Sequence, residues 1–214
     1  MNNLDCFKLT DDGFWKVRLD NKSEVSVPSF TRVILGDVIE DRQKFTIIDG
    51  VHRSKNASIS LKYGNPFVGK CITYYDNIEL VLKLYVSRDQ SMSQIHGILE
   101  TPVGQLKCMS WGLANEEGKK IILDNVYKIK IPDFPHKSIS RYNNYSKFYR
   151  VWFGLELLVG YENFFNRYLH FGSLSWGCVS CISGSLWTSL VILLLRSRLK
   201  NSLDNVGLLK VNYI

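Results

Sequence analysis

Residues 168–181, YLHFGSLSWGCVSC, bring a histidine, a glycine and a cysteine close together. His170 precedes Cys178 by eight positions, and Gly177 lies directly before the cysteine. A cysteine accepts an acyl group only as its thiolate, which a nearby imidazole or the N-terminus of a following helix favours. A glycine lets the backbone turn sharply, so consecutive N–H groups can form an oxyanion hole. These residue types and spacings predict acyl transfer through a thioester.

The same segment resembles the L,D-transpeptidases of the YkuD type, whose hallmark is a histidine-glycine-serine or threonine stretch followed by Ser-His-Gly-Cys. Residues 170–173 (HFGS) are similar to the first part and residues 175–179 (SWGCV) to the second. Upstream, residues 101–104 (TPVG) and 121–132 (IILDNVYKIKIP) are similar to the family's Thr-Pro-x-Gly-x-Tyr-x-Ile region, with a different separation. The resemblance covers residues 76–214.

The resemblance implies roles for individual residues. Cys178 would be the nucleophile and His170 the base, while Ser173 or Ser175 would orient the imidazole. The oxyanion hole would consist of the backbone N–H groups of Trp176, Gly177 and Cys178. No metal ion and no organic cofactor is implied, because cysteine, histidine and backbone suffice for this chemistry.

The chain departs from the family pattern at several positions. Trp176 stands where the family has a histidine, Ser180 stands where it has an arginine, and the loop between histidine and cysteine is shorter. Compact variants of this kind occur among antibacterial toxins that modify peptidoglycan. Arg167 or Arg150 could hold the substrate carboxylate in place of the missing arginine, and Trp152 could line the acyl-donor groove.

The implied substrate is the tetrapeptide stem of peptidoglycan. Cys178 would attack the carbonyl between the third residue, a diamino acid, and the terminal D-alanine, and His170 would protonate the departing D-alanine. A second stem amine would then give a cross-link, a D-amino acid would give exchange, and water would give L,D-carboxypeptidase cleavage. The sequence leaves these three outcomes open.

Two other interpretations of the chain stay open. It could be a cysteine hydrolase of another amide, or a non-catalytic β-rich binding module in which Cys178 is a packing residue. Cys178 and Cys181 form a CxxC motif, but no second pair accompanies it, so zinc is not expected. Aromatic and basic residues alternate over residues 141–150, yet no RNA-binding signature is present, so we expect no nucleic-acid partner.

Charge and cysteine content narrow the function classes further. The net charge is +7, and the excess comes from residues 127–214, which hold 11 basic and 4 acidic side chains. A basic second half suits a partner rich in carboxylates, such as peptidoglycan stems. Five cysteines at irregular spacings do not indicate a disulfide framework, and their odd number leaves at least one thiol outside any disulfide.

The sequence also bears on where the protein acts. Its first ten residues lack the apolar core of a secretory signal, which favours delivery by a secretion apparatus to the periplasm or cell envelope of the producer or of a target cell. An antibacterial effector of this kind would have an immunity protein as a partner. The most apolar run, residues 186–195, is too short to cross a bilayer, so we expect no stable membrane insertion.

The elements that must position these residues are mostly strands. Alternating apolar residues and turn signals predict a mainly β fold, in which residues 79–86 and 95–99 form a hairpin. Further strands are expected over residues 32–35, 44–48, 57–63, 105–109, 120–123, 126–131, 150–158 and 207–211, with a polar loop over 132–148. One helix is expected over residues 186–199, with Arg196, Arg198 and Lys200 at its C-terminal end. We divide the chain into a β-rich portion of unknown role, residues 1–75, and a catalytic domain, residues 76–214.

Overall fold

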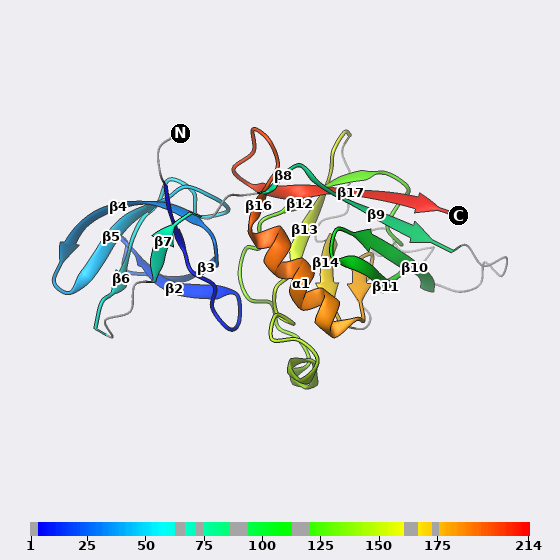
Figure 1. Ribbon diagram of the computed structural model, residues 1–214, viewed down its shortest axis with the longest axis horizontal. Coiled ribbons are helices and arrows are strands. Elements are labelled where there is room, and N and C mark those ends of the chain that lie inside the picture. Colours follow the sequence, from blue (N-terminus) through cyan, green and yellow to red (C-terminus); the bar gives the residue numbers. More distant parts are fainter. Residues whose placement is uncertain are drawn as a thin grey trace.

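The computed structural model describes residues 4–62, 67–71, 75–85, 94–112, 120–160, 167–172 and 176–214. Within them the chain is mainly β with one α-helix, which confirms the expected fold class (Figure 1). The first part is an antiparallel sheet in the order β3-β2-β6-β5-β4-β1-β7. Its strands are β1 (Asp5–Phe7), β2 (Phe14–Leu19), β3 (Glu24–Pro28), β4 (Arg32–Ile39), β5 (Arg42–Ile47), β6 (Asn56–Ser60) and β7 (Val68–Lys70).

The second part is a closed barrel in the order β10-β11-β15-β14-β13-β12-β17-β9. Its strands are β9 (Ile78–Leu84), β10 (Gln94–Thr101), β11 (Gly104–Trp111), β12 (Val126–Lys130), β13 (Phe153–Leu157), β14 (Arg167–Phe171), β15 (Val179–Cys181) and β17 (Asn205–Tyr213). Strand β9 buries Leu80, Leu82 and Leu84 and pairs antiparallel with β10, so the expected hairpin is confirmed. The pairs β14–β15 and β9–β17 are parallel, and the second pair brings the first and last strands of the barrel side by side.

Helix α1 (Gly184–Leu195) packs its apolar side chains into the barrel core. It buries Trp187, whose Nε1 donates a hydrogen bond to the carbonyl of Phe148. The expected extension to residue 199 is wrong, because the chain leaves the helix and forms β16 (Ser197–Arg198), which pairs with β8 (Tyr75–Asp76). Arg198 still contacts the end of the helix, since its Nη1 donates to the carbonyl of Leu195.

The strand expected over residues 120–123 is not formed. Side chains rather than a neighbouring strand satisfy the backbone there: the N–H of Ile122 donates to Ser110 Oγ and that of Leu123 to Tyr127 Oη. The loop over residues 132–148 is present and contains the short 3₁₀ helix η1 (Ser140–Asn144). The sequence also predicts a turn at residues 115–118 (NEEG), which lie outside the described residues.

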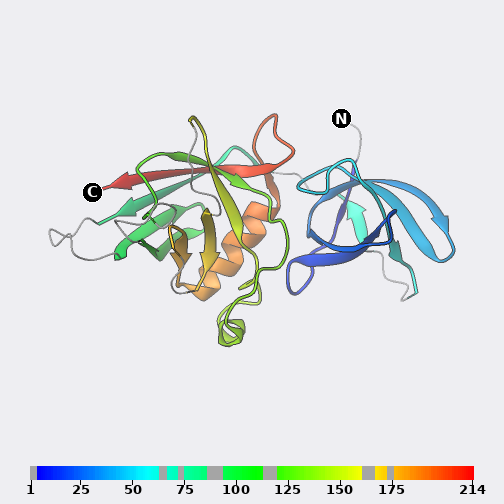
Figure 2. The same cartoon turned by 180° about the vertical axis from the view of Figure 1, so that it is seen from behind.

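The first sheet and the barrel lie side by side (Figures 1 and 2). Phe14 and Phe30 of the first part belong to the same apolar cluster as the barrel core. Asp49 follows β5, and its buried carboxylate accepts hydrogen bonds from Arg32 and from Arg198 of β16. These contacts fix the first sheet against the barrel.

Candidate functional site

The parallel pairing of β14 with β15 positions the candidate base. His170 lies directly opposite Ser180, and Leu169 lies opposite Val179. Directly opposed residues of neighbouring strands point to the same face, so the imidazole and the Ser180 hydroxyl meet. His170 Nε2 lies 3.1 Å from Ser180 Oγ, and Nδ1 lies 3.1 Å from the carbonyl oxygen of Phe171. Both ring nitrogens are therefore engaged.

Aromatic rings cover His170. Trp152 stacks on its imidazole with ring centroids 4.2 Å apart, and His136 also stacks on Trp152, at 4.7 Å. Only 2% of His170 is exposed. This burial lowers the pKa of His170 to about 4; the hydrogen bond to the Phe171 carbonyl opposes the shift, and the positive charge of His136 adds to it. The imidazole is consequently neutral at pH 7.

Cys178 directly precedes β15 and is 1% exposed. Its Sγ accepts a hydrogen bond from the backbone N–H of Tyr168 at 3.3 Å, so the thiol lies against β14. Helix α1 begins at Gly184, two residues before its expected start. Strand β15 separates its N-terminus from the Cys178 thiol.

The segment expected to form the oxyanion hole is tightly packed. Gly177 has a φ of +68°, and its N–H donates to the carbonyl of Trp111 at 2.6 Å. Trp176 stacks on Trp111 with ring centroids 3.7 Å apart. A Cβ at Gly177 would lie 2.7 Å from Arg167 Nη1, so both the backbone conformation and the close approach of Arg167 require glycine. Ser173 and Ser175 lie outside the described residues.

The candidate substrate residues have different surroundings. Arg167 is buried at the barrel wall, where Nη1 donates to the carbonyls of Lys120 and Gly177. Arg150 instead holds the loop that carries His136, because its Nε donates to the carbonyl of His136. Trp152 lies against His170, as described above, rather than in an open groove.

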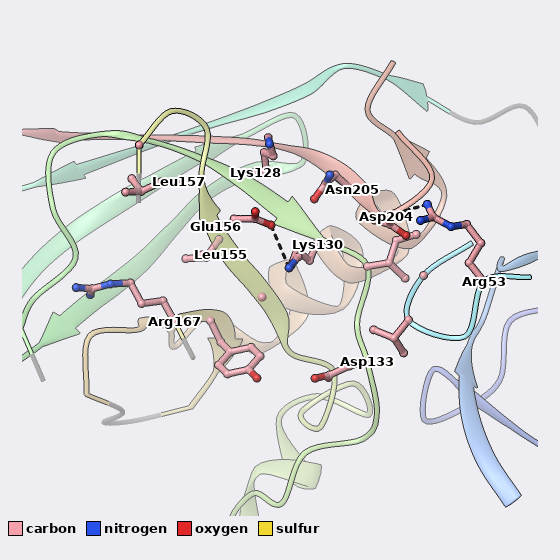
Figure 3. A pocket seen from close by; sticks show the side chains of 16 residues that line it. Arg53, Lys128, Lys130, Asp133, Leu155, Glu156, Leu157, Arg167, Asp204 and Asn205 are labelled. Carbon is pink, nitrogen blue, oxygen red and sulfur yellow. Dashed lines mark hydrogen bonds and ion pairs between the residues drawn. The ribbon is translucent and has the colours of Figure 1, made fainter. Parts of the chain in front are cut away.

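Sequence reasoning missed a charged groove of about 890 Å³ that lies between the two parts (Figure 3). Its lining side chains of opposite charge form two ion pairs, Arg53–Asp204 at 2.8 Å and Lys130–Glu156 at 3.0 Å. The groove is lined by Gly50, Val51, Arg53, Lys128, Lys130, Ile131, Asp133, Gly154, Leu155, Glu156, Leu157, Gly160, Arg167, Tyr168, Asp204 and Asn205. These residues come from separate segments that only the fold brings together. In the sequence, one sign of this groove is the alternation over residues 127–130, where Lys128 and Lys130 are charged and Tyr127 and Ile129 are buried.

Tyr168 of β14 lines the groove and lies near both candidate catalytic residues. It lies directly opposite Gly154 of β13, and its backbone N–H donates to Cys178 Sγ. Tyr168 and His170 are two residues apart on one strand and therefore share a face. His170 and Cys178 themselves are buried and do not line the groove.

Comparison with models of protein families, with curated proteins and with solved structures found no match for this chain. Among the described residues, no group of three or more His, Cys, Asp or Glu side chains is arranged to hold a metal ion. Within the same residues, no helix combines the length and apolar composition that a membrane span needs.

Proposed function

We propose that the barrel is a cysteine acyltransferase of the type that the L,D-transpeptidase resemblance implies, with Cys178 as nucleophile and His170 as base. The parallel pairing of β14 with β15 carries this proposal. It places His170 opposite Ser180, two residues after Cys178, although seven residues separate the histidine from the cysteine along the chain. The base on β14 and the nucleophile directly before β15 thus belong to neighbouring segments of the barrel, and this chemistry needs both groups.

The electrostatics of the two groups set a condition on these roles. The lowered pKa of His170 keeps its imidazole neutral at pH 7, but a base with a pKa of about 4 takes up a proton weakly, so catalysis requires the site to open and the pKa of His170 to rise. The backbone N–H of Tyr168 donates to Cys178 Sγ, and a thiolate accepts such a hydrogen bond more strongly than a thiol does. Ser180, which the sequence analysis treated only as a departure from the family, is the hydroxyl that orients the imidazole.

The charged groove supports a peptide substrate with both carboxylates and amines, as peptidoglycan stems have. Lys128 and Lys130 could bind carboxylates, while Glu156 and Asp133 could bind an amine. The first part of the chain contributes Arg53 to this groove, which gives residues 1–75 a role in substrate binding. The same proposal places the protein in the periplasm or envelope of its producer or of a target cell.

A second candidate function is a non-catalytic binding module that uses the same groove. Two observations favour it: Cys178 is almost fully buried, and the N–H of Gly177 already donates to Trp111. Catalysis requires Sγ to become accessible to a substrate carbonyl. The two functions therefore differ in the reactivity of Cys178.

Timed labelling with iodoacetamide at pH 7, followed by peptide mass spectrometry, separates them. Exposure alone predicts that Cys71 reacts first, because the other four cysteines are buried. The acyltransferase proposal predicts that Cys178 reacts first and that His170→Ala slows its labelling at least tenfold, whereas the control His96→Ala on β10 leaves the rate unchanged. Labelling of Cys71 first, with Cys178 as slow as Cys108, would refute the acyltransferase.

Incubation with purified muropeptides then tests the substrate. Mass spectrometry should detect loss of D-alanine, D-amino-acid exchange or dimers, and Cys178→Ala should abolish all three. A reactive Cys178 with unchanged tetrapeptide stems would point to a hydrolase of another amide. An unreactive Cys178 together with muropeptide binding would favour the binding module.

A further inference from the structure

Two cysteines outside the proposed catalytic pair face each other in the barrel core. Cys108 of β11 lies directly opposite Cys181 of β15, and their Sγ atoms are 2.8 Å apart. Both side chains are buried, 2% and 0% exposed, within the main apolar cluster. Along the chain the two cysteines are 73 positions apart, and the sequence suggests no link between them.

The backbone around the two cysteines suits a covalent link. The N–H of Ile182 donates to the carbonyl of Lys107 at 3.1 Å, directly beside the pair. Lys107 and Ile182 are thus a hydrogen-bonded pair, and hydrogen-bonded and non-hydrogen-bonded pairs alternate along an antiparallel ladder. The next pair, Cys108 and Cys181, is therefore non-hydrogen-bonded, and the Cα atoms of such pairs lie about 4.5 Å apart. Disulfides bridge Cα separations of about 4.4–6.8 Å, so the sulfurs can bond without a backbone shift.

We propose that Cys108 and Cys181 form a disulfide that links β15 to β11 when the chain folds in the presence of a disulfide oxidant. One thiolate attacks the oxidant's disulfide and displaces one of its thiolates, giving a mixed disulfide. The second cysteine then attacks the protein sulfur of that mixed disulfide and displaces the other. The two protein thiols are oxidised and the oxidant is reduced to two thiols, so electrons and protons balance.

The burial of the two cysteines determines when the disulfide forms, and its position determines which strand it anchors. The burial of Cys181 and its contact with Cys108 raise the pKa of the Cys181 thiol, so exchange is slow once the barrel has closed and takes place during folding. The link would anchor a strand of only three residues that also carries Ser180, the hydrogen-bond partner of His170. The link uses two of the five cysteines, so an odd number of cysteines lies outside it.

Thiol counting after refolding tests the proposal. The unfolded chain is refolded either with oxidised and reduced glutathione or with a phosphine reductant, then denatured, alkylated with iodoacetamide and weighed. We expect three alkyl groups after the first treatment and five after the second. Tryptic mapping should join the peptide that begins at Cys108 to the peptide of residues 168–196, with Cys178 alkylated. Five alkyl groups in both samples, or a Cys178–Cys181 bond, would overturn the proposal.

Thermal unfolding provides a second measurement. A link that closes a 73-residue loop should raise the Tm of the oxidised protein by roughly 10 °C over the reduced protein. Cys108→Ser should remove this difference, and the control Cys71→Ser should keep it. If Cys108→Ser does not fold, the thiol count of the unaltered chain decides alone. Neither measurement depends on catalysis, so a failure here leaves the acyltransferase proposal standing, and the reverse also holds.

Discussion

Replacing Asp49 with asparagine removes the charge at the centre of the contact between the first sheet and the barrel. The Asp49 side chain has no exposed surface, and its carboxylate accepts hydrogen bonds from Arg32 at 2.7 Å and Arg198 at 2.8 Å. Arg198 is also nearly buried, with 6% of its side chain exposed. Asp49→Asn therefore leaves a buried guanidinium without its counter-charge.

The expected loss follows from this burial. Burial itself opposes ionisation of Asp49, but Arg198 and Arg32 outweigh it and hold the pKa of the carboxyl below its ordinary value. Removing one partner of a buried ion pair costs about 3–5 kcal/mol of unfolding free energy. In a chain of this length such a loss lowers the Tm by about 6–20 °C.

The chain offers a matched control in Arg53–Asp204, a second ion pair between the same two parts. Its side chains are 44% and 42% exposed, so Asp204→Asn should cost only about 0–1 kcal/mol. Urea unfolding followed by circular dichroism measures both variants against the unaltered chain. If the two variants lose unfolding free energies within 1 kcal/mol of each other, the argument from burial fails.

The ion pairs of Asp49 also predict how the stability of the fold depends on pH. The pKa of Asp49 is lower in the folded than in the unfolded chain, so the unfolded chain takes up the proton first. The stability that Asp49 contributes is present above the ordinary carboxyl pKa of about 4 and is lost as the pH falls below it. In Asp49→Asn the free energy of unfolding should therefore decrease less as the pH falls below about 4. Urea midpoints measured over a pH series test this, and an equal decrease in the variant and the unaltered chain would show that Asp49 is not responsible.

Three further predictions concern the site and the groove. Gly177→Ala should destabilise the chain by about 1–3 kcal/mol more than Gly160→Ala, because both glycines have positive φ but only Gly177 approaches Arg167 closely; equal urea midpoints would contradict this. As the pH falls, the unfolded chain protonates His170 near pH 6.5, whereas the folded chain does so only near pH 4. The free energy of unfolding should therefore fall by about 3 kcal/mol as the pH is lowered from 6.5 to 4, and His170→Gln should abolish this fall in urea titrations. Lys128→Gln should weaken muropeptide binding severalfold in calorimetry with an unchanged Tm, and unchanged affinity would remove Lys128 from the ligand site.

Much of the β structure was predictable because its signals are local. The alternation of Leu80, Leu82 and Leu84 in β9 marks one buried face, and the neighbouring β10 follows after a short connection. The same local reasoning failed at residues 120–123, where apolar residues suggested a strand. There the partners of the backbone are the hydroxyls of Ser110 and Tyr127, which no local pattern reveals.

The sequence by itself determined the residue types and conformational needs of the site. The spacing of His170 and Cys178 is written in the chain, and glycine at position 177 anticipates a turn that other residues adopt only under strain. Its alternating apolar residues also determined that a strand over residues 79–86 would bury one face.

Only the tertiary structure decided which distant residues meet. Barrel closure places Cys108 against Cys181, 73 residues away, and docking of the first sheet places Asp49 against Arg198, 149 residues away. The groove likewise arises from five separate segments. Such contacts depend on strand order and register across the whole barrel, and these are fixed by the joint burial of all the apolar faces rather than by any spacing along the chain.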